Sequence, residues 1–482
     1  MRALTALVLI LVAAPPAFAE MPALPPGLGG QPELPSGLGG PPELPPGLGG
    51  QPELPPGLGG APELPAGLNG ADTSGQAAIE AEEPSALFTG FFDLRYGART
   101  QDNALMPRDI LGEGRLHLEA GFGTIIQTRL AFDVVGDAVL SGQSLDLNAG
   151  TGVLDLRQAN VSFSPVASVD VKLGRQVLTW GTGDLLFIND LFPKDYESFL
   201  VGRDIEYLKA PSDALKLSFF SDIVNLDLVY TPQFDPDRYI DGERLLFFSP
   251  IAGSQIGGAA IPVALPDDSF SDDELALRLY RTVAGFELAA YFYDGLWKSP
   301  VGYDAALSEN TFPQLQVIGA SLRGPVGPGL LNVELGYYDS NEDPTGSDPN
   351  IPNSQTRWLI GYEMEVARET TLGLQYYQEI RDDQAAYLAA LPTGMTARPE
   401  TRDVLTARLT RSFLDQRLIA NLFVADSPSD KDGYVRASLS YSVSDALRLN
   451  VGINHFYGDT EQTFYGQFQD DSNAYVGLRF GF

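Results

Sequence analysis

From residue 86 to the end of the chain, apolar and polar residues alternate within segments of about ten residues. In residues 447–454, for example, every second position is Leu, Leu, Val and Ile, and the positions between are Arg, Asn, Gly and Asn. A period of two residues is typical of β-strands with one apolar and one wet face. The pattern therefore predicts half-exposed strands and not helices.

Carried through the region, this alternation predicts an all-β fold of about eighteen strands. A single-chain bacterial outer-membrane barrel requires an even number, and sixteen strands remain an alternative if two weak segments fail. A strand at Ile205–Lys209 would make the number odd, so we assign that segment to a loop. The predicted strands are residues 88–99, 112–121, 124–135, 152–163, 168–177, 213–221, 224–232, 273–282, 286–295, 314–324, 329–339, 355–366, 370–381, 401–413, 416–426, 432–443, 447–458 and 472–482.

The connections between these segments alternate between eight very short ones and longer, acidic ones. Short turns on one side of the membrane and long loops on the other are typical of transmembrane β-barrels. A soluble β-sandwich does not account for loop lengths that differ so consistently. We therefore predict a transmembrane antiparallel β-barrel at residues 86–482, with its short turns in the periplasm.

The N-terminal region has a different composition. Residues 1–19 combine one Arg, an apolar stretch and an Ala-Phe-Ala ending, which predicts a secretory signal peptide. Residues 20–85 are predicted to be a disordered tether and linker, because residues 21–70 are five copies of a Pro- and Gly-rich decapeptide. We expect the tether in the periplasm, either as a passive spacer or as a repeated ligand for a periplasmic protein partner.

Composition and charge narrow the class of protein further. There is no cysteine, so the chain has neither disulfides nor a lipidated N-terminal Cys. The formal net charge of −32 argues against nucleic-acid binding, which needs basic patches. We expect much of this acid in external loops, where it keeps the protein soluble and bridges through divalent cations to lipopolysaccharide, or serves a specific ligand. Outer-membrane lipid and lipopolysaccharide of a Gram-negative bacterium are the expected surroundings.

The polar face of the strands carries more Arg than this net charge suggests. Guanidinium groups stay charged and suit carboxylates, phosphates and sugar edges. They either pair with neighbouring acids and only fill the lumen, or favour acidic and polyhydroxylated solutes. Arg175 falls on the lipid-facing parity. A bulge at Gly174 or an error in the predicted register would account for this. The predicted pore-lining residues are Arg95, Arg115, Arg129, Arg157, Arg278, Arg357, Arg408, Arg417, Arg436, Arg448 and Arg479.

The long loop at residues 178–212 is the candidate constriction. It mixes aromatic and acidic residues, and an acidic loop that faces basic walls would generate a transverse field that orients solutes. The alternative is an external loop that packs on its neighbours. The residues predicted to form the constriction are Trp180, Asp184, Asp190, Asp195 and Glu197.

The same segment carries a family resemblance. Gly174-Arg175-Gln176, Trp180-Gly181 and the run from Asn189 to Asp195 resemble a poorly characterised family of large proteobacterial outer-membrane barrels. The chain is also similar, more distantly, to the alginate-export barrels, whose lumens are rich in Arg. Phe192-Pro193 stands where the first family usually has Asn-Pro. The resemblance implies a porin-like barrel.

The C-terminal strand resembles the terminal-aromatic signal that outer-membrane assembly machinery recognises. Its aromatic residues Tyr475, Phe480 and Phe482 include the last residue of the chain. The expected partner of this signal is the assembly machinery, and the signal says nothing about a solute.

Chemistry beyond a channel is poorly supported. His117 is on the lumen parity and His455 on the lipid-facing parity, so a shared catalytic site is not expected. With no Cys and two separated His, we expect no metal site, no haem and no other cofactor. Asp339, Asn341 and Asp343 open like a calcium loop, but no Glu follows at the twelfth position.

These observations predict a porin-like outer-membrane channel that passes or exports a small-to-medium polar or anionic solute. The alternative is a structural or docking barrel that recruits a periplasmic complex through its repeat tail. The sequence predicts neither the identity of the solute nor the direction of transport.

Overall fold

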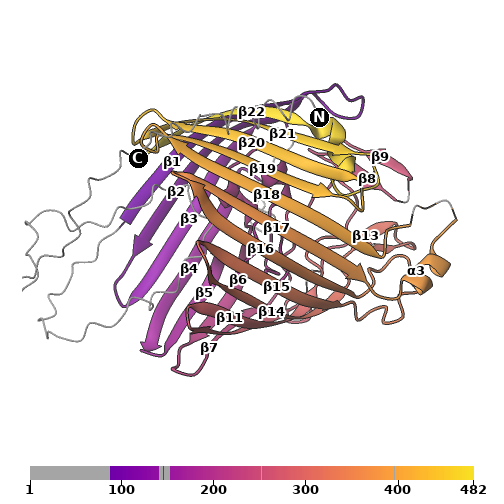
Figure 1. The fold of residues 1–482 in the computed structure, drawn as a ribbon, viewed down its shortest axis with the longest axis horizontal. Helices are drawn as coiled ribbons and strands as arrows, with labels where there is room; N and C mark the ends of the chain where they lie inside the picture. Colours follow the sequence, from indigo (N-terminus) through magenta and orange to yellow (C-terminus); the bar gives the residue numbers. More distant parts are fainter. Residues whose placement is uncertain are drawn as a thin grey trace, which may run out of the picture. The chain divides into compact units, whose positions relative to one another are not determined.

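The computed structural model describes residues 87–140, 145, 152–250, 252–266, 268–393, 395 and 397–482. Eighteen of its strands form one antiparallel sheet that closes into a barrel (Figure 1). The signal peptide and the repeated tether predicted at residues 1–19 and 20–85 lie outside the described residues.

Each barrel strand pairs with the next along the chain, and β1 pairs with β22 to close the ring. The barrel strands are β1 (Leu87–Arg99), β2 (Asp109–Phe122), β3 (Ile126–Asp137), β4 (Leu154–Val166), β5 (Val169–Val177), β6 (Pro211–Phe219), β7 (Asn225–Thr231), β10 (Glu274–Val283), β11 (Phe286–Leu296), β14 (Gln314–Val326), β15 (Gly329–Asp339), β16 (Gln355–Ala367), β17 (Thr370–Arg381), β18 (Thr401–Phe413), β19 (Leu418–Ser427), β20 (Asp432–Ser442), β21 (Leu447–Gly458) and β22 (Asn473–Gly481). The prediction of eighteen strands is confirmed, and the alternative of sixteen is not.

The strand ends also agree closely with the predicted ones. The largest differences are three residues, at the start of β2 (Asp109 against a predicted 112) and at the end of β4 (Val166 against 163). Alternation of side chains was sufficient to place the strands because both faces of a barrel wall constrain the sequence at every second position.

The long connections contain the remaining elements, and the short ones lie with the start of β1 and the end of β22. The segment assigned to a loop at Ile205–Lys209 contains a 3-10 helix and no strand, as predicted. The elements of the loops are α2 (Tyr196–Leu200), η1 (Ile205–Leu208), the paired strands β8 (Phe247–Ser249) and β9 (Ser254–Ile256), the paired strands β12 (Gly302–Asp304) and β13 (Glu309–Thr311), α3 (Gln384–Ala390) and η2 (Gly466–Asp471).

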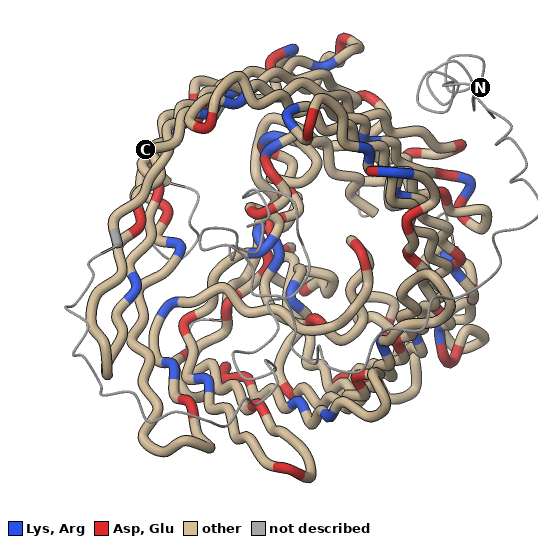
Figure 2. The backbone as a smooth tube through the Cα atoms, turned by 60° about the vertical axis from the view of Figure 1, so that its left-hand side comes forward, with Lys and Arg blue, Asp and Glu red and all other residues tan. Residues whose placement is uncertain are grey.

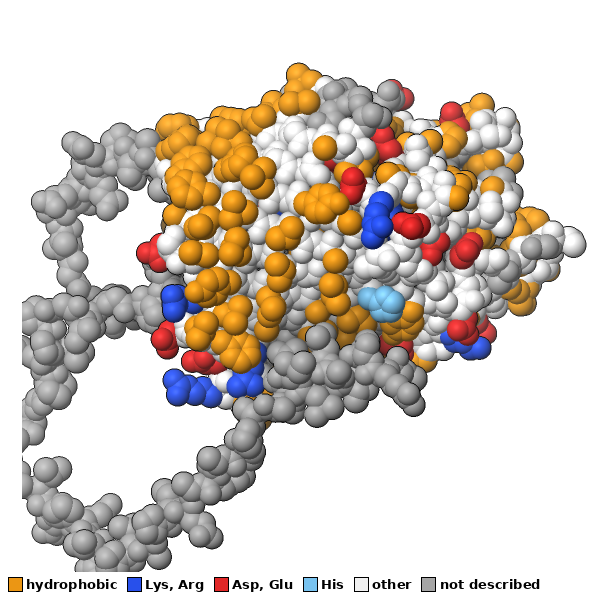
Figure 3. Space-filling model, turned by 90° about the horizontal axis from the view of Figure 1, so that it is seen from above, with side chains coloured by type: hydrophobic (Ala, Val, Ile, Leu, Met, Phe, Trp, Pro, Cys, Tyr) orange, Lys and Arg blue, Asp and Glu red, His pale blue; other side chains and the backbone are white. Residues whose placement is uncertain are grey.

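The outer face of the barrel is apolar and the inner face is polar. On β22, for example, Val476 and Phe480 are exposed on the outside, whereas Tyr475, directly before Val476, points inward and is buried. Rows of apolar side chains cover this side of the molecule, and charged side chains gather beyond the ends of the rows (Figure 3). None of the helices in the described part of the chain is long and apolar enough to cross a membrane.

The last residue of the chain takes part in closing the barrel. The Phe482 N–H donates to the Gly90 carbonyl at 2.9 Å, and the Gly90 N–H donates to the Phe482 carbonyl at 3.0 Å. A side chain at Gly90 would meet the Phe482 ring, because a Cβ there would lie 2.8 Å from the nearest ring carbon. The terminal aromatic residue therefore has a defined position against Gly90 of β1.

Candidate functional site

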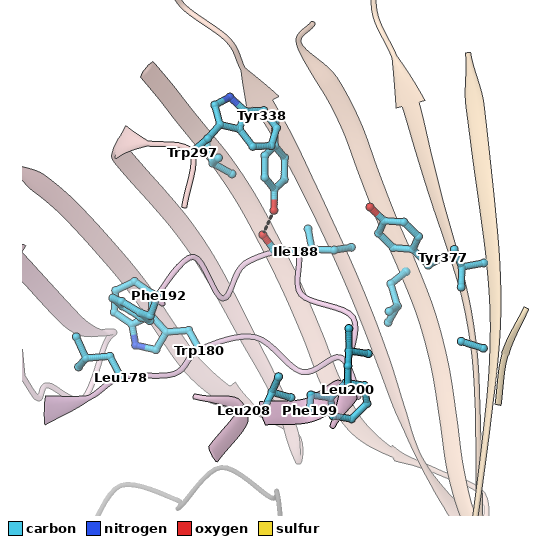
Figure 4. Packing of buried hydrophobic residues seen from close by; sticks show 14 of the residues in the cluster. Leu178, Trp180, Ile188, Phe192, Phe199, Leu200, Leu208, Trp297, Tyr338 and Tyr377 are labelled. Atoms are coloured by element: carbon cyan, nitrogen blue, oxygen red, sulfur yellow. Dashed lines mark hydrogen bonds between the residues drawn. The ribbon is translucent and has the colours of Figure 1, made fainter. Parts of the chain in front are cut away.

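The connection between β5 and β6, residues 178–210, lies inside the ring of strands, and we call it the inner loop. Figure 2 shows charged residues of both signs on the segments within the ring. Figure 4 shows the apolar residues of the inner loop packed toward the wall, and the Tyr338 hydroxyl of β15 donates to the Ile188 carbonyl. The apolar residues of the inner loop that are buried in this way are Leu178, Trp180, Ile188, Phe192, Phe199, Leu200, Val201 and Leu208.

On one side of the lumen, a buried carboxylate of β15 holds the turn of the inner loop. Glu334 accepts hydrogen bonds from the backbone N–H of Thr182, of Gly183 at 2.7 Å and of Asn189 at 3.2 Å. The Asn189 side-chain amide donates to the same carboxylate at 2.9 Å. Backbone donors that converge on a buried carboxylate satisfy it without a cation. This single side chain therefore fixes both arms of the turn.

The next strands hold the tip of the loop. Gln375 of β17 accepts from the Asp184 N–H and donates to the Asp184 carbonyl, both at 2.8 Å. Arg408 of β18 forms a two-point ion pair with the Asp184 carboxylate, with Nη2 and Oδ1 2.9 Å apart. The side chains of Asp184 and Arg408 keep 41% and 23% of their exposure, so solvent reaches this pair.

The helix α2 is held at both of its ends. At its N-terminus the Asp195 carboxylate accepts from the Ser198 N–H at 2.7 Å. At its C-terminal end the guanidinium of Arg436, on β20, donates to the Phe199 carbonyl at 3.1 Å and to the Arg203 carbonyl at 2.9 Å. A cation at the carbonyl end of a helix also complements the helix dipole.

Opposite the β15 contacts, the inner loop meets the closure of the barrel. Arg95 of β1 and Arg479 of β22 both bind the Asp204 carboxylate at 2.6 Å, and both also bind Asp93 at 2.8 Å. Arg479 reaches Glu206 at 2.8 Å as well. Burial alone would raise the pKa of Asp204, but the two arginines outweigh it and hold this pKa below its usual range.

The strands β2 and β4 also bind the inner loop. Arg203 of the inner loop binds Glu113 of β2 at 2.7 Å. The ring of Tyr207 lies against two wall guanidinium groups, with its centroid 4.4 Å from the Arg115 Cζ and 4.9 Å from the Arg157 Cζ. The inner loop therefore bonds to the wall on opposite sides of the lumen.

A second connection, residues 232–273 between β7 and β10, covers the inner loop, and we call it the cover loop. Its Arg238 forms a two-point ion pair with Asp155 of β4 at 2.7 and 2.9 Å. Its Arg244 binds Glu197 of α2 at 2.6 Å. Burial raises the pKa of Glu197 in spite of the nearby Arg244 and Arg203. The cover loop therefore clamps α2 between itself and the wall.

The predicted constriction acids differ in what they contact. Asp190 is buried and pairs with Lys194 at 3.0 Å, Asp195 caps α2, and Glu197 binds the cover loop. Asp184 is the most exposed of the four. Trp180 is buried edge-on against Phe192, with ring centroids 4.8 Å apart. Asp184 is therefore the one acid of these four that both binds a wall arginine and is substantially exposed to solvent.

Most of the predicted pore-lining arginines do face inward, and each one whose contacts are described above holds the inner loop. Arg357 lies over the Tyr338 ring at 4.0 Å. Arg278 binds Glu287 at 2.6 Å, and Arg129 binds Glu119 at 2.7 Å with half of its side chain exposed. Arg448 occupies the inward position opposite Arg479 on the neighbouring strand. Their role in passing a solute stays a prediction.

Arg417 is a correction to the predicted lumen face. Leu414, Asp415 and Gln416 all have positive φ, between 54° and 66°, so the left-handed turn extends through them and β19 begins only at Leu418. Arg417 is therefore an exposed residue of a short turn. Its position in the sequence continued the strand alternation, which gives no signal for such a turn.

Arg175 lies on the outward face, as its parity indicated. No shift of register occurs between β5 and β6, where Arg175 is opposite Asp213 and binds it at 2.6 Å. Gly174 has a φ of +111°, and the Asn160 side chain lies across this point and donates to the Arg175 carbonyl at 2.9 Å. A bulge between β5 and β6 is thus not needed to explain an arginine at this position.

Sequence reasoning missed the residues that hold the inner loop from β15, from β17 and from the cover loop. Glu334 and Gln375 look like ordinary lumen-facing polar residues, and nothing in their spacing marks them. Arg238 and Arg244 had a usable signal, because they are the only basic residues among the many acids of residues 232–273. Two cations in an otherwise acidic loop indicate specific carboxylate partners.

The histidines do not meet. His117 Nδ1 lies 2.5 Å from the Asp133 carboxylate inside the barrel, whereas His455 is exposed on the outward parity of β21. Within the described part of the chain, no group of three or more His, Asp or Glu side chains could hold a metal ion.

No family model matches the sequence, and no curated protein matches it. Solved barrels do resemble it in structure. OccAB4 of Acinetobacter baumannii is 10% identical over 82% of this chain and 97% of that one, with a TM-score of 0.49. The outer-membrane protein OmpT of Vibrio cholerae is 11% identical over 83% and 99%, with a TM-score of 0.39. A triple mutant of the Rhodopseudomonas blastica porin is 11% identical over 83% and 100%, with a TM-score of 0.37.

Similarity at this level carries no argument about what this chain does. The prediction of a porin-like barrel is confirmed by the closed ring of eighteen strands itself.

Proposed function

We propose that this protein is a porin-like channel of a Gram-negative outer membrane, and that the inner loop is its constriction. The observation that carries the proposal is the solvent-exposed ion pair between Asp184 at the loop tip and Arg408 on the wall. An acid and a base held side by side at the edge of a water-filled passage form a dipole whose field acts on the ions that pass it.

Several charged residues of the wall support a wet passage past the inner loop. Arg129 and Glu119 pair on the inward face of β2 and β3, and the Arg129 side chain is 49% exposed. Lys216 of β6 is also partly exposed, 3.9 Å from Asp227. Charged side chains with this exposure on an inward face require water beside them.

The proposed solute is a small-to-medium polar or anionic molecule. The exposed cations, Arg129 and Arg408, keep their charge at any physiological pH, and the planar fork of a guanidinium suits carboxylate and phosphate groups. Each is also paired with an acid, so we expect moderate anion preference and not exclusion of cations.

The test is single-channel recording of the full chain in planar bilayers. We expect discrete conductance steps, and Arg408→Gln should shift the permeability ratio toward cations by roughly threefold. Arg368→Gln is the matched control, because that side chain is exposed in a short turn and lines no passage. A folded wild-type chain that conducts no ions would contradict the proposal.

The alternative of a docking barrel depends on the repeat at residues 21–70. Deletion of these residues should leave the conductance unchanged if the channel function resides in the barrel. Loss of a co-purifying periplasmic protein in the deleted chain would show that the tail has a binding function of its own.

A further inference from the structure

Three inward-facing glycines lie where the turn of the inner loop rests on the wall. Gly319 of β14 and Gly336 of β15 are directly opposite each other, and Gly361 of β16 is opposite Asn332 of β15. None of the three has a positive φ, so the backbone does not require glycine at these positions. Glycine in a strand lowers stability relative to alanine, which indicates that another group needs the space.

At Gly336 that group belongs to the inner loop. A Cβ on Gly336 would lie 2.7 Å from a methyl carbon of Ile188, and its next neighbour would be a ring carbon of Tyr338 at 3.2 Å. Carbon atoms in contact are about 3.5–4.0 Å apart, so alanine at this position would displace Ile188 by roughly 1 Å. Figure 4 shows Ile188 beside Tyr338, whose hydroxyl donates to the Ile188 carbonyl. Ile188 therefore packs directly on the bare backbone of Gly336.

Gly319 makes room for the next residue of the inner loop. A Cβ there would overlap the Asn189 side-chain oxygen, and the Asn189 amide nitrogen donates to Glu334 at 2.9 Å. The same Cβ would also lie 2.8 Å from the Leu335 carbonyl oxygen of the wall itself. A substitution at Gly319 would thus disturb both the loop and the sheet, whereas at Gly336 the closest atom belongs to the loop.

Gly361 makes room for a wall side chain that reaches the other arm of the turn. A Cβ there would overlap the Asn332 side-chain oxygen, and the Asn332 amide nitrogen donates to the Thr182 carbonyl at 3.1 Å. The three glycines therefore admit the contacts of both arms of the turn that carries Asp184.

We propose that Gly336 is a positioning residue of the constriction, because it sets how closely the turn of the inner loop lies against β15 and thereby where Asp184 stands in the passage. This inference rests on the proposed channel function. Glu334 holds both arms of the turn, so a displacement of Ile188 away from the wall moves the turn as a unit toward the lumen. Asp184 moves with it, and the passage beside Arg408 becomes narrower.

The experiment is single-channel recording of the full chain in planar bilayers, with single and double variants compared. Gly336→Ala should lower the conductance by roughly a third, because the displaced turn occupies part of the passage. Ile188→Ala removes the methyl carbon that the new Cβ meets, so Gly336→Ala combined with Ile188→Ala should recover the wild-type conductance. Gly121→Ala is the matched control, since it adds a methyl group on the inward face of β2 with no atom within 4 Å.

An effect of the substitution on the strand alone would not be relieved by a change in the inner loop. A lower conductance that persists in the double variant would therefore overturn the proposal, as would wild-type or higher conductance of a folded Gly336→Ala variant. If Gly336→Ala does not fold, Ile188→Phe enlarges the same contact from the side of the loop and leaves the wall unchanged. It should also lower the conductance, and wild-type conductance in this variant would overturn the proposal.

Hydrogen exchange separates this inference from the proposed function. The amides of residues 181–190 should exchange faster in Gly336→Ala than in the wild type, and the double variant should restore the wild-type rates. A chain that shows this exchange pattern but conducts no ions refutes the channel and leaves Gly336 as the residue that places the turn. A conducting chain in which Gly336→Ala changes neither exchange nor conductance refutes the role of Gly336 and leaves the channel in place.

Discussion

Arg408 on β18 and Asp184 at the tip of the inner loop are 224 residues apart in sequence and form a two-point ion pair inside the barrel. Gln375 of the neighbouring strand holds the backbone of Asp184 by two hydrogen bonds, and its own side chain is held by the Thr406 hydroxyl, so the loop tip is fixed against the wall independently of the ion pair. The pair therefore joins the tip of the inner loop to the wall strand β18.

Removal of the acid should change selectivity in the opposite direction to removal of the base. Asp184→Asn leaves Arg408 without its negative partner while Gln375 still holds the loop tip. We expect the anion-to-cation permeability ratio to rise roughly threefold, measured from reversal potentials in a salt gradient. An unchanged ratio, with an unchanged conductance, would mean that permeating ions do not pass this pair.

Glu334 should be the most sensitive residue of the loop attachment. Glu334→Gln keeps one accepting oxygen and replaces the other by a donor amide, so either the N–H groups of Thr182 and Gly183 or those of Asn189 lose their acceptor. Buried donors that lose their acceptor cost about 1–3 kcal/mol, and more next to a charge. We expect faster proteolysis or hydrogen exchange across residues 181–190 and unchanged exchange in β20. Equal exchange rates across the inner loop in Glu334→Gln and in the wild type would contradict this role of Glu334.

A disulfide between the inner loop and β15 should form readily. The native chain has no cysteine, so an engineered pair can cross-link only with itself. A Cβ at Gly336 on β15 would lie 2.7 Å from a methyl carbon of Ile188, so Ile188→Cys with Gly336→Cys places two thiols in contact. The expected result is spontaneous cross-linking in intact outer membranes, seen as altered mobility in gels. The control pair, Ile188→Cys with Ser440→Cys, should not cross-link. Cross-linking of the control pair but not of the test pair would contradict the position of the inner loop.

Asp471 of η2 makes the contact between the cover loop and the wall dependent on pH. It accepts from the Leu246 N–H at 2.7 Å and from Arg99 at 2.8 Å, and burial raises its pKa to about 6. A raised pKa favours the protonated form in the folded state. Protonated Asp471 therefore stabilises the folded state fully below about pH 4. This stabilisation, on the order of 3 kcal/mol, is lost as the pH rises through about 6.

The amide of Leu246 reports this directly. After correction for intrinsic rates, its exchange protection should be greater at pH 4 than at pH 7. In Asp471→Asn the difference between the two pH values should disappear. A pH dependence that persists unchanged in the variant would assign the effect to other groups.

Alternation of side chains predicted the barrel almost completely, since lipid and water constrain opposite faces of each strand. It failed at Arg417, where three successive left-handed residues prolong a turn without any glycine. The inner loop could be predicted in position but not in its attachments, because Glu334, Gln375 and Arg408 reach it from strands more than 150 residues away. The wall arginines were predicted as a group; that Arg95, Arg436 and Arg479 hold the loop depends on which carbonyls and carboxylates it presents.

The most direct test of the constriction is a thiol-block experiment on Asp184→Cys. The native chain has no cysteine, so a negatively charged methanethiosulfonate reagent would modify this site alone. The expected result is a stepwise fall of single-channel conductance to roughly half or less as the reagent reacts, because the added group stands in the passage. Leu388→Cys, exposed on α3 of an external loop, is the control and should react without changing the conductance. A conductance that stays constant while mass spectrometry shows complete modification of Asp184→Cys would contradict the account.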